Sequence, residues 1–197
     1  MSADRPADGY RIVVVCTANI CRSPMAEAMI RQGLRAAGAE AAGVVVESAG
    51  VYGHEGSPIA PGSASALAAL GIEEDGHRGR LLTPAIVGAA DLVLTMEERH
   101  RAAILAGTPE AHGRTFALRE FARLAGGQET LAGAGVAERA RALVADAGAR
   151  RAALPWPGVD DVPDPYGGPG EGYHACAALL LAEVRTLLRP LLSSPRP

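Results

Sequence analysis

The sequence predicts an α/β fold in which helices cover both faces of a parallel sheet. Short apolar runs rich in β-branched residues alternate along the chain with longer segments rich in Ala and Leu. A Ser-Pro and a Thr-Pro pair mark helix starts, because the hydroxyl can cap a helix and Pro fits its first position. The 197 residues are 48% hydrophobic, which is enough for one domain, and we expect residues 1–197 to form it.

The first 70 residues contain two predicted strands, each followed by a helix. The strands are expected at Ile12 to Val15 and Val44 to Glu47, and the helices from Ser23 to about Gly38 and from Ser63 to Leu70. Residues 48–62 are rich in Gly and Pro and are predicted to form a loop.

The remaining segments continue the alternation. Strands are expected at Leu92 to Leu94 and Thr115 to Leu118, and helices from Thr83-Pro84, at Glu97 to Leu105, at Val136 to Ala153 and at Tyr173 to Leu192. The arginines of the Val136 to Ala153 helix are expected on a solvated face, with the binding of an acidic partner as the alternative; they are Arg139, Arg141, Arg150 and Arg151. Residues 193–197 are expected to be a disordered tail.

Composition excludes several classes of function. The net charge of −3, with every basic residue an Arg or a His, gives no overall basic field for nucleic acid. Three cysteines without a CxxC pair favour neither a zinc site nor a disulfide framework. No apolar run is long enough to span a bilayer, and the first ten residues do not resemble a signal peptide. We therefore expect a cytoplasmic protein without cofactor or metal, and without a nucleic-acid or membrane partner.

The first predicted strand ends at Cys16, and Arg22 follows after five residues, Thr17, Ala18, Asn19, Ile20 and Cys21. We call Cys16 to Arg22 the cysteine loop. If its backbone N–H groups converge at the start of the next helix, they form a cup for an anion, and the Arg22 guanidinium suits phosphate oxygens. The same field favours the thiolate of Cys16, the nucleophilic form of the side chain. The alternative is that Cys16 is only a small buried side chain at the end of a strand. The spacing between Cys16 and Arg22 argues against this alternative.

Attack on a phosphate ester also requires an acid for the leaving oxygen. The candidate is Asp164, which lies between Pro163 and Pro165 in the segment Val162 to Gly168, here called the acid loop. The two prolines stiffen the backbone on both sides of the carboxyl. Asp160 and Asp161 are competitors in less rigid surroundings.

In their order and separation, these motifs resemble the low molecular weight protein tyrosine phosphatases. That family has a C-x5-R-[ST] loop after its first strand and an Asp-Pro-Tyr or Asp-Pro-Phe acid loop near its C-terminus. The matching segments are Cys16 to Ser23, Pro24 to Glu27, Glu47 to Gly50, His77 to Arg80, Asp91 to Met96 and Asp164 to Tyr166. The resemblance implies a doubly wound, three-layer α/β sandwich with a four-stranded parallel sheet.

The resemblance also implies roles for the matched residues. Cys16 is then the nucleophile, Arg22 binds the transition state and Asp164 is the general acid and later the base. Three residues are implied to support the loop by hydrogen bonds: Asn19, Ser48 and His77. Ser23 is implied to donate a hydrogen bond to the Cys16 sulfur. Cys21 is either a reversible disulfide partner of Cys16 or only a packing residue, and Cys176 is expected in the core.

The chain also departs from the family pattern. Ala18 replaces a glycine of the loop, Val51 a threonine and Gly62 an arginine. Gly53 aligns with the usual aromatic wall of the substrate pocket, so Tyr52 is expected to replace that wall and Tyr166 to form the opposite one. Residues 126–161 form a longer segment than compact members have. Either a lid or a passive insertion fits this length.

The leading interpretation is a metal-independent phosphatase that acts on phosphotyrosine in a protein substrate, with phosphate or a similar oxyanion bound in the loop. A related branch that removes phosphate from arginine carries Thr where this chain has Ile20, whose bulk favours an aryl ester. A thiol-coupled arsenate reductase on the same fold needs further cysteines in a mobile segment, and Cys176 lies in a predicted helix. A non-catalytic phosphate-binding module is expected to lack one of Cys16, Arg22 and Asp164, and all three are present.

Overall fold

The computed structural model describes residues 9–36, 38, 43–126, 135–153 and 160–192. Its centre is a four-stranded parallel sheet in the order β2-β1-β3-β4. The strands are β1 (Tyr10–Cys16), β2 (Val44–Gly50), β3 (Leu92–Thr95) and β4 (Thr115–Ala117). All four predicted strands and the parallel sheet are therefore confirmed. Cys16 pairs with Gly50, and Val15 with Thr95, so the carboxyl ends of three strands meet at one edge.

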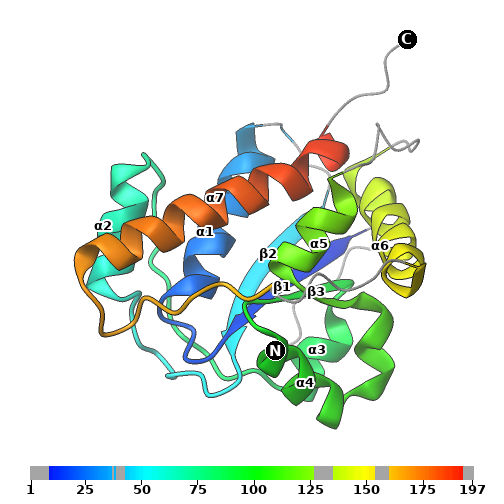
Figure 1. Ribbon diagram of the computed structural model, residues 1–197, viewed down its shortest axis with the longest axis horizontal. Helices are drawn as coiled ribbons and strands as arrows, with labels where there is room; N and C mark the ends of the chain where they lie inside the picture. The colour runs from blue at the N-terminus through cyan, green and yellow to red at the C-terminus, as the bar shows by residue number, and fades with distance from the viewer. Residues whose placement is uncertain (1–8, 37, 39–42, 127–134, 154–159, 193–197) are drawn as a thin grey trace.

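Helices cover both faces of the sheet, as Figure 1 shows. The described helices are α1 (Arg22–Ala36), α2 (Pro61–Ala69), α3 (Pro84–Ala89), α4 (Glu98–Gly107), α5 (Leu118–Ala125), α6 (Val136–Ala153) and α7 (Gly170–Leu192), with a 3-10 helix, η2, at Pro109–Arg114. Helix α7 lies across α1 (Figure 1).

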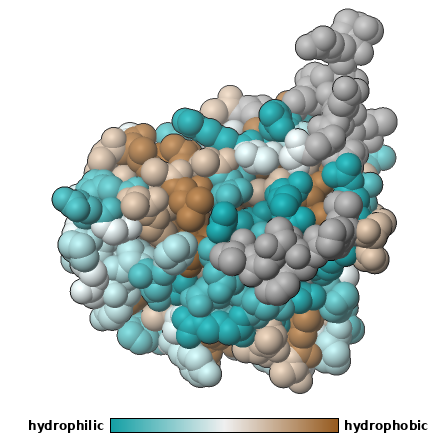
Figure 2. Space-filling model, in the orientation of Figure 1, coloured by the Kyte–Doolittle hydropathy of each residue, from teal (hydrophilic) through white to brown (hydrophobic). Residues whose placement is uncertain are grey.

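Alternate residues of β1 enter two different cores, because successive side chains of a strand point to opposite faces. Ile12 and Val14 pack in the larger core, with side chains from α1, α5, α6 and α7. Val13 and Val15 pack in a smaller core with Val87 and other residues of α3, β3, α4 and η2. The three-layer sandwich is therefore confirmed. The face in Figure 2 is mainly hydrophilic, with hydrophobic residues in limited areas.

Helix α5 is an element that the sequence analysis did not predict. The strand expected to reach Leu118 ends at Ala117, and α5 begins at Leu118. Leu118, Phe121 and Leu124 are buried on one side of this short helix, at the spacing of an amphipathic helix. Phe121 packs edge-on against Phe116, with ring centroids 5.1 Å apart. The apolar periodicity of these eight residues is the feature of the sequence from which this helix could have been predicted.

The solvated arginine face predicted for α6 is confirmed only in part, because Arg141 is exposed whereas Arg139, Arg150 and Arg151 are half-buried. Four arginines of this helix donate to main-chain carbonyls of other elements: Arg139 to Leu191, Arg141 to Gly9, Arg150 to Leu124 and Arg151 to Thr115. Arg151 also lies over the Phe116 ring, 3.7 Å from its centroid, and bonds both oxygens of Glu120. These contacts fasten α6 to its neighbours, because an arginine stem packs well while its fork binds oxygens.

Helix α6 makes up most of the described part of the long segment 126–161. It packs against α5 and α7, and Ala140, Leu143 and Ala147 on it are buried. Residues 127–134, 154–159 and the predicted tail 193–197 lie outside the described residues. The choice between lid and insertion therefore stays a prediction. No helix in the described ranges is both long enough and apolar enough to cross a bilayer.

Candidate active site

The cysteine loop connects the end of β1 to the start of α1 at the carboxyl edge of the sheet, where parallel α/β sheets place their sites. Asn19 has a φ of 58°, and it is the one non-glycine residue with positive φ among those that the structure describes. Its side chain explains how this backbone is held. Nδ2 donates to Ser23 Oγ (2.9 Å) and Ser48 Oγ (2.8 Å), and Oδ1 accepts from the Arg80 N–H (2.9 Å). The loop is thus shaped by several distant segments.

Cys16 is buried, with two polar groups at its sulfur. The Asn19 N–H donates to Sγ over 3.3 Å, and Ser23 Oγ lies 3.0 Å from Sγ. Because Ser23 Oγ already accepts a hydrogen bond from Asn19 Nδ2, its own proton is left for the sulfur. Both contacts stabilise negative charge on Cys16. Ser23 was predicted to cap the helix, but α1 begins one residue earlier and the hydroxyl serves the loop instead.

Arg22 is almost completely buried, with 1% of its side chain exposed. Nη1 donates to Glu97 Oε1 (2.5 Å) and to the Val162 carbonyl (2.9 Å), and Nη2 donates to Asp164 Oδ2 (2.6 Å). Within the described ranges, Nε has no hydrogen-bond partner although it is buried. An orphaned, charged donor is costly, so this guanidinium suits a further anion such as a phosphoryl group.

Glu97 is a site residue that the sequence analysis missed. Partial burial alone acts to raise its pKa, but hydrogen bonds from Arg99 and Arg22 outweigh this and hold the pKa at about 2. Glu97 therefore stays ionised and fixes one side of the Arg22 fork. Its position just beyond the third strand, where the carboxyl ends of the strands meet, was the available signal.

His100 on α4 is a second residue that was missed. Its Nε2 lies 2.9 Å from Thr17 Oγ1, which also accepts longer hydrogen bonds from Arg22 Nη2 (3.4 Å) and Arg99 Nη2 (3.3 Å). Because both arginines can only donate, the Thr17 proton is left for Nε2 of His100. Burial lowers the pKa of His100 to about 4, which keeps the imidazole neutral and able to accept. No pattern in the sequence distinguishes this histidine.

Asp164 reaches the same site from the acid loop. Its side chain is 39% exposed, with Oδ2 on Arg22 and Oδ1 accepting from the Tyr166 N–H (3.3 Å). The two competing carboxylates are engaged elsewhere: Asp160 pairs with Arg123 (3.0 Å), and Asp161 accepts from the Glu98 N–H (2.8 Å). Asp164 is therefore the carboxylate of the three that lines the pocket.

Cys16, Arg22 and Asp164 meet in a pocket of about 230 Å³. The other lining residues are Thr17, Ala18, Ile20, Cys21, His54 and Tyr166. Tyr166 lines the pocket and is 65% exposed, and its role as a wall for the substrate stays a prediction. Apolar and aromatic walls with a few polar groups at one end are typical of a small-molecule or side-chain pocket.

The expected wall at Tyr52 requires correction. Tyr52 lines a different hollow, beside α3 and α4, and His54 lines the pocket instead. Gly53 does not take the place of the aromatic residue either, because a Cβ there would lie 2.1 Å from the Arg80 carbonyl oxygen. The physical reason is the path of the chain. Val51 and Tyr52 form a turn in which the Gly53 N–H bonds the Gly50 carbonyl, so the chain changes direction between Tyr52 and His54, whose N–H groups bond the Thr17 and Ala18 carbonyls.

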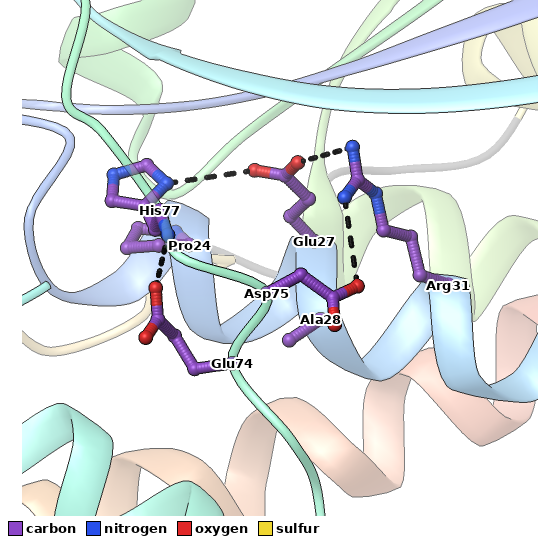
Figure 3. Close-up of a pocket in the computed structure, with 7 residues that line it drawn as sticks. All are labelled: Pro24, Glu27, Ala28, Arg31, Glu74, Asp75 and His77. Atoms are coloured by element: carbon purple, nitrogen blue, oxygen red, sulfur yellow. Dashed lines mark hydrogen bonds and ion pairs between the residues drawn. The ribbon is translucent and has the colours of Figure 1, made fainter.

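Behind the cysteine loop lies a small polar hollow, drawn in Figure 3. His77 and Glu27 face each other there, and Arg31 reaches from α1 towards Glu27 and Asp75. His77 Nε2 lies 2.7 Å from the Asn19 carbonyl oxygen, and Ser48 Oγ donates to Glu27 Oε2 (2.5 Å). Asn19, Ser48 and His77 are thus brought together around the loop, although their role in a reaction stays a prediction.

All three cysteines are free thiols and are buried. Burial raises the pKa of the Cys21 thiol to about 11 and that of Cys176 to about 12. Both are therefore neutral thiols at physiological pH. Cys176 packs in the larger core, as expected. A disulfide between Cys21 and Cys16 stays a prediction.

A family model described as low molecular weight phosphotyrosine protein phosphatase matches residues 11–131. The low molecular weight protein-tyrosine-phosphatase Etp of Escherichia coli K12 is 42% identical over 105 residues, which are 53% of this chain and 66% of Etp. The match thus spans slightly less than two thirds of Etp. A protein-tyrosine-phosphatase of Streptomyces coelicolor is 32% identical over 184 residues, 91% of this chain and 92% of that protein. The solved structure of the YwlE arginine phosphatase from Geobacillus stearothermophilus has a TM-score of 0.67 at 31% identity, covering 92% of both chains.

Proposed function

Because the chain belongs to the low molecular weight phosphotyrosine protein phosphatase family, we propose that it hydrolyses phosphotyrosine in proteins through a cysteinyl-phosphate intermediate. The observation that carries the proposal is the meeting of three groups in one pocket. A sulfur with two hydrogen-bond donors, a buried guanidinium and a carboxyl on a loop between prolines line the same space. These are a nucleophile, an oxyanion clamp and a proton donor.

In the first step the Cys16 thiolate attacks phosphorus, an S–P bond forms and the bond from phosphorus to the tyrosine oxygen breaks. Arg22 and the loop N–H groups bind the phosphoryl oxygens, where negative charge is concentrated. Asp164 donates its proton to the leaving phenolate oxygen. Since Asp164 and the phosphoryl group both bind Arg22, we propose that the bound phosphoryl group displaces the carboxyl from Arg22 and leaves it facing the ester oxygen.

In the second step water attacks phosphorus and the S–P bond breaks. The Asp164 carboxylate takes a proton from this water, and the products are phosphate and the Cys16 thiolate. Ser23 stabilises that thiolate as it leaves, because its proton is directed at Sγ. No metal or other cofactor enters these steps.

The pocket walls support an aryl ester as substrate. Ile20 and Tyr166 offer apolar surface to a phenyl ring, and His54 offers a flat ring on the other loop. Phosphoarginine is the second candidate, because the likeness to the arginine phosphatase of G. stearothermophilus covers nearly the whole chain. The absence of a hydroxyl at Ile20 argues against it, since a guanidinium N–H beside an apolar side chain loses a hydrogen-bond partner.

The proposal is tested first with p-nitrophenyl phosphate in the presence of a chelator. Hydrolysis is expected, with Cys16→Ser inactive and Asp164→Asn slowed. Full activity of Cys16→Ser would remove the nucleophile. Peptides that carry phosphotyrosine, phosphoarginine or phosphoserine at the same position then define the substrate class. Faster turnover of phosphoarginine than of phosphotyrosine would favour the second candidate.

We also propose that residues 1–197 act as one phosphatase domain in the cytoplasm. Three free thiols suit a reducing compartment, where the nucleophile stays available. The segment 126–161 leads directly into the acid loop, and its Asp161 holds the start of α4 through the Glu98 N–H. Deleting residues 127–134 tests whether the segment governs access. If the segment is a lid, this deletion should change KM. If the segment is a passive insertion, KM should stay the same.

A further inference from the structure

Glu97 binds two arginines at the edge of the candidate active site. Its Oε1 accepts hydrogen bonds from Nη1 of Arg22 (2.5 Å) and Nη2 of Arg99 (2.9 Å), and its Oε2 accepts one from Nε of Arg99 (2.6 Å). The same two arginines also meet at Thr17, whose Oγ1 lies 3.4 Å from Nη2 of Arg22 and 3.3 Å from Nη2 of Arg99. Because Thr17 lines the pocket, Arg99 reaches the rim of the proposed phosphate site.

The charged groups in direct contact with Arg22 leave little attraction for an anion. Arg22 carries one positive charge, and two carboxylates bind its fork, Glu97 and Asp164. In the proposed first step Asp164 carries a proton and moves away, whereas Glu97 stays ionised. An ion pair of Arg22 and Glu97 alone is neutral, and a neutral pair attracts a phosphoryl dianion only weakly. The Cys16 thiolate of the proposed mechanism adds a further negative charge to the pocket.

Arg99 supplies the missing positive charge. Two arginines and one carboxylate, in contact with one another, leave one positive charge uncompensated. The helix itself does not explain this arginine, because Arg99 lies in the first turn of α4, where the helix dipole disfavours a cation. Its two hydrogen bonds to Glu97 hold the guanidinium in place, although 60% of the Arg99 side chain is exposed.

We propose that Arg99 is a positioning residue that offsets the charge of Glu97, so that the positive charge of Arg22 attracts the phosphoryl group of the substrate. The proposal rests on the function proposed above, and it adds a residue that is not part of the pocket lining. Glu97 can then orient the Arg22 fork without cancelling its attraction for an anion. Inorganic phosphate experiences the same attraction as the phosphoryl group, so it is a suitable probe.

The experiment measures how inorganic phosphate inhibits hydrolysis of p-nitrophenyl phosphate when the charge at position 99 is changed in steps. Arg99→Lys keeps the charge, so its inhibition constant should stay within about twofold of that of the intact chain. The constant should rise about fivefold in Arg99→Gln and about 25-fold in Arg99→Glu, because each step removes one positive charge near the anion. High salt should reduce these differences, since Arg99 is largely exposed and its field is screened.

Arg185→Gln is the matched control. It removes the same charge as Arg99→Gln at another exposed position, on α7. Arg185 lies about 22 Å along this helix from Gly170, the first residue of α7. The inhibition constant of phosphate should therefore be the same in Arg185→Gln as in the intact chain.

The outcomes are distinguishable. Equal inhibition constants in the Lys, Gln and Glu variants of Arg99, or differences that persist at high salt, would assign Arg99 a merely structural role and overturn the proposal. A rise in Arg185→Gln as large as that in Arg99→Gln would show an effect of net charge alone, and this too would overturn it. In these cases hydrolysis of p-nitrophenyl phosphate still supports the phosphatase. Lack of this hydrolysis in the intact chain would overturn both proposals.

Discussion

The Nη2 atom of Arg22 donates to Oδ2 of Asp164 over 2.6 Å, so the guanidinium proposed to bind phosphate is also the partner of the proposed acid. Arg22 is buried, whereas the Asp164 side chain is 39% exposed. The arginine is therefore fixed, and the carboxyl is the member of the pair that can turn away. Binding of an anion at Arg22 and the position of Asp164 are coupled by this contact.

Asp164→Asn is expected to slow hydrolysis and to tighten the binding of inorganic phosphate. The amide cannot donate or take the proton, so kcat should fall about 100-fold or more. It also pairs less strongly with Arg22, so phosphate meets less competition and its inhibition constant should decrease. Steady-state kinetics with phosphate as inhibitor measures both values. Weaker inhibition by phosphate would contradict the proposed competition.

Glu97→Gln is expected to lower kcat/KM by about tenfold or more, because it removes the charge that orients Arg22. The neighbouring Glu98→Gln is the matched control. Glu98 pairs with Arg101 on the surface, and its side chain is 51% exposed, so its loss should change activity little. Rates on p-nitrophenyl phosphate decide the question, and equal rates in both variants would show that Glu97 does not position Arg22.

His100 is expected to make stability fall as the pH is lowered below about 6.5. Burial lowers its folded pKa to about 4, below the ordinary value of about 6.5, so between these values the unfolded chain binds a proton that the folded chain does not. Above pH 6.5 this contribution to the free energy of unfolding is fully present. By pH 5 the free energy of unfolding should be lower by about 2 kcal/mol. Urea unfolding at pH 7 and pH 5 measures it.

The control for this pH dependence is a pair of variants. His100→Gln should reduce the difference in the free energy of unfolding between pH 7 and pH 5 by about 2 kcal/mol. His174→Gln, at an exposed position on α7, should retain the difference of the intact chain. If the two variants behave alike, His100 is not the group that titrates.

Gly53→Ala is expected to destabilise the protein and to reduce activity. The added Cβ would lie 2.1 Å from the Arg80 carbonyl oxygen, so the segment beside the cysteine loop must shift. Gly88→Ala on α3 is the matched control, since a Cβ there meets nothing within 4 Å and Ala favours a helix. Thermal unfolding should give a lower Tm for Gly53→Ala and an unchanged or higher one for Gly88→Ala. A Tm for Gly53→Ala equal to that of the intact chain would contradict the close approach.

The alternation of strands and helices could be predicted because it depends on local sequence, whereas the four-stranded sheet and the meeting of Cys16, Arg22 and Asp164 were implied by the resemblance to the family. β-branched runs form strands, and prolines on both sides of Asp164 identify the acid loop. The competing Asp160 and Asp161 are excluded only by tertiary contacts, as their ion pair and hydrogen bond show. The roles of the three convergent residues stay predictions that the kinetic experiments test.

Other features depend on contacts between distant segments and were missed for that reason. Glu97 and His100 acquire their place from Arg22 and Thr17, more than 70 residues earlier in the chain. The arginines of α6 look like a charged solvent face in the sequence, yet their partners are carbonyls of other elements. His54 replaces Tyr52 in the pocket because the chain pairs with the cysteine loop in one particular register.

The dependence of the cysteine loop on remote partners has a consequence for biosynthesis. Asn19 is held by Ser48 and Arg80, and Arg22 by Glu97, Val162 and Asp164, so the parts of the cradle leave the ribosome at widely separated times. A nascent chain that ends before the acid loop carries the sulfur but lacks the proposed proton donor and two of the groups that orient the arginine. On the proposed mechanism, the chain therefore becomes able to hydrolyse a phosphate ester only at the end of synthesis, and a product truncated before the acid loop should leave phosphorylated proteins unchanged.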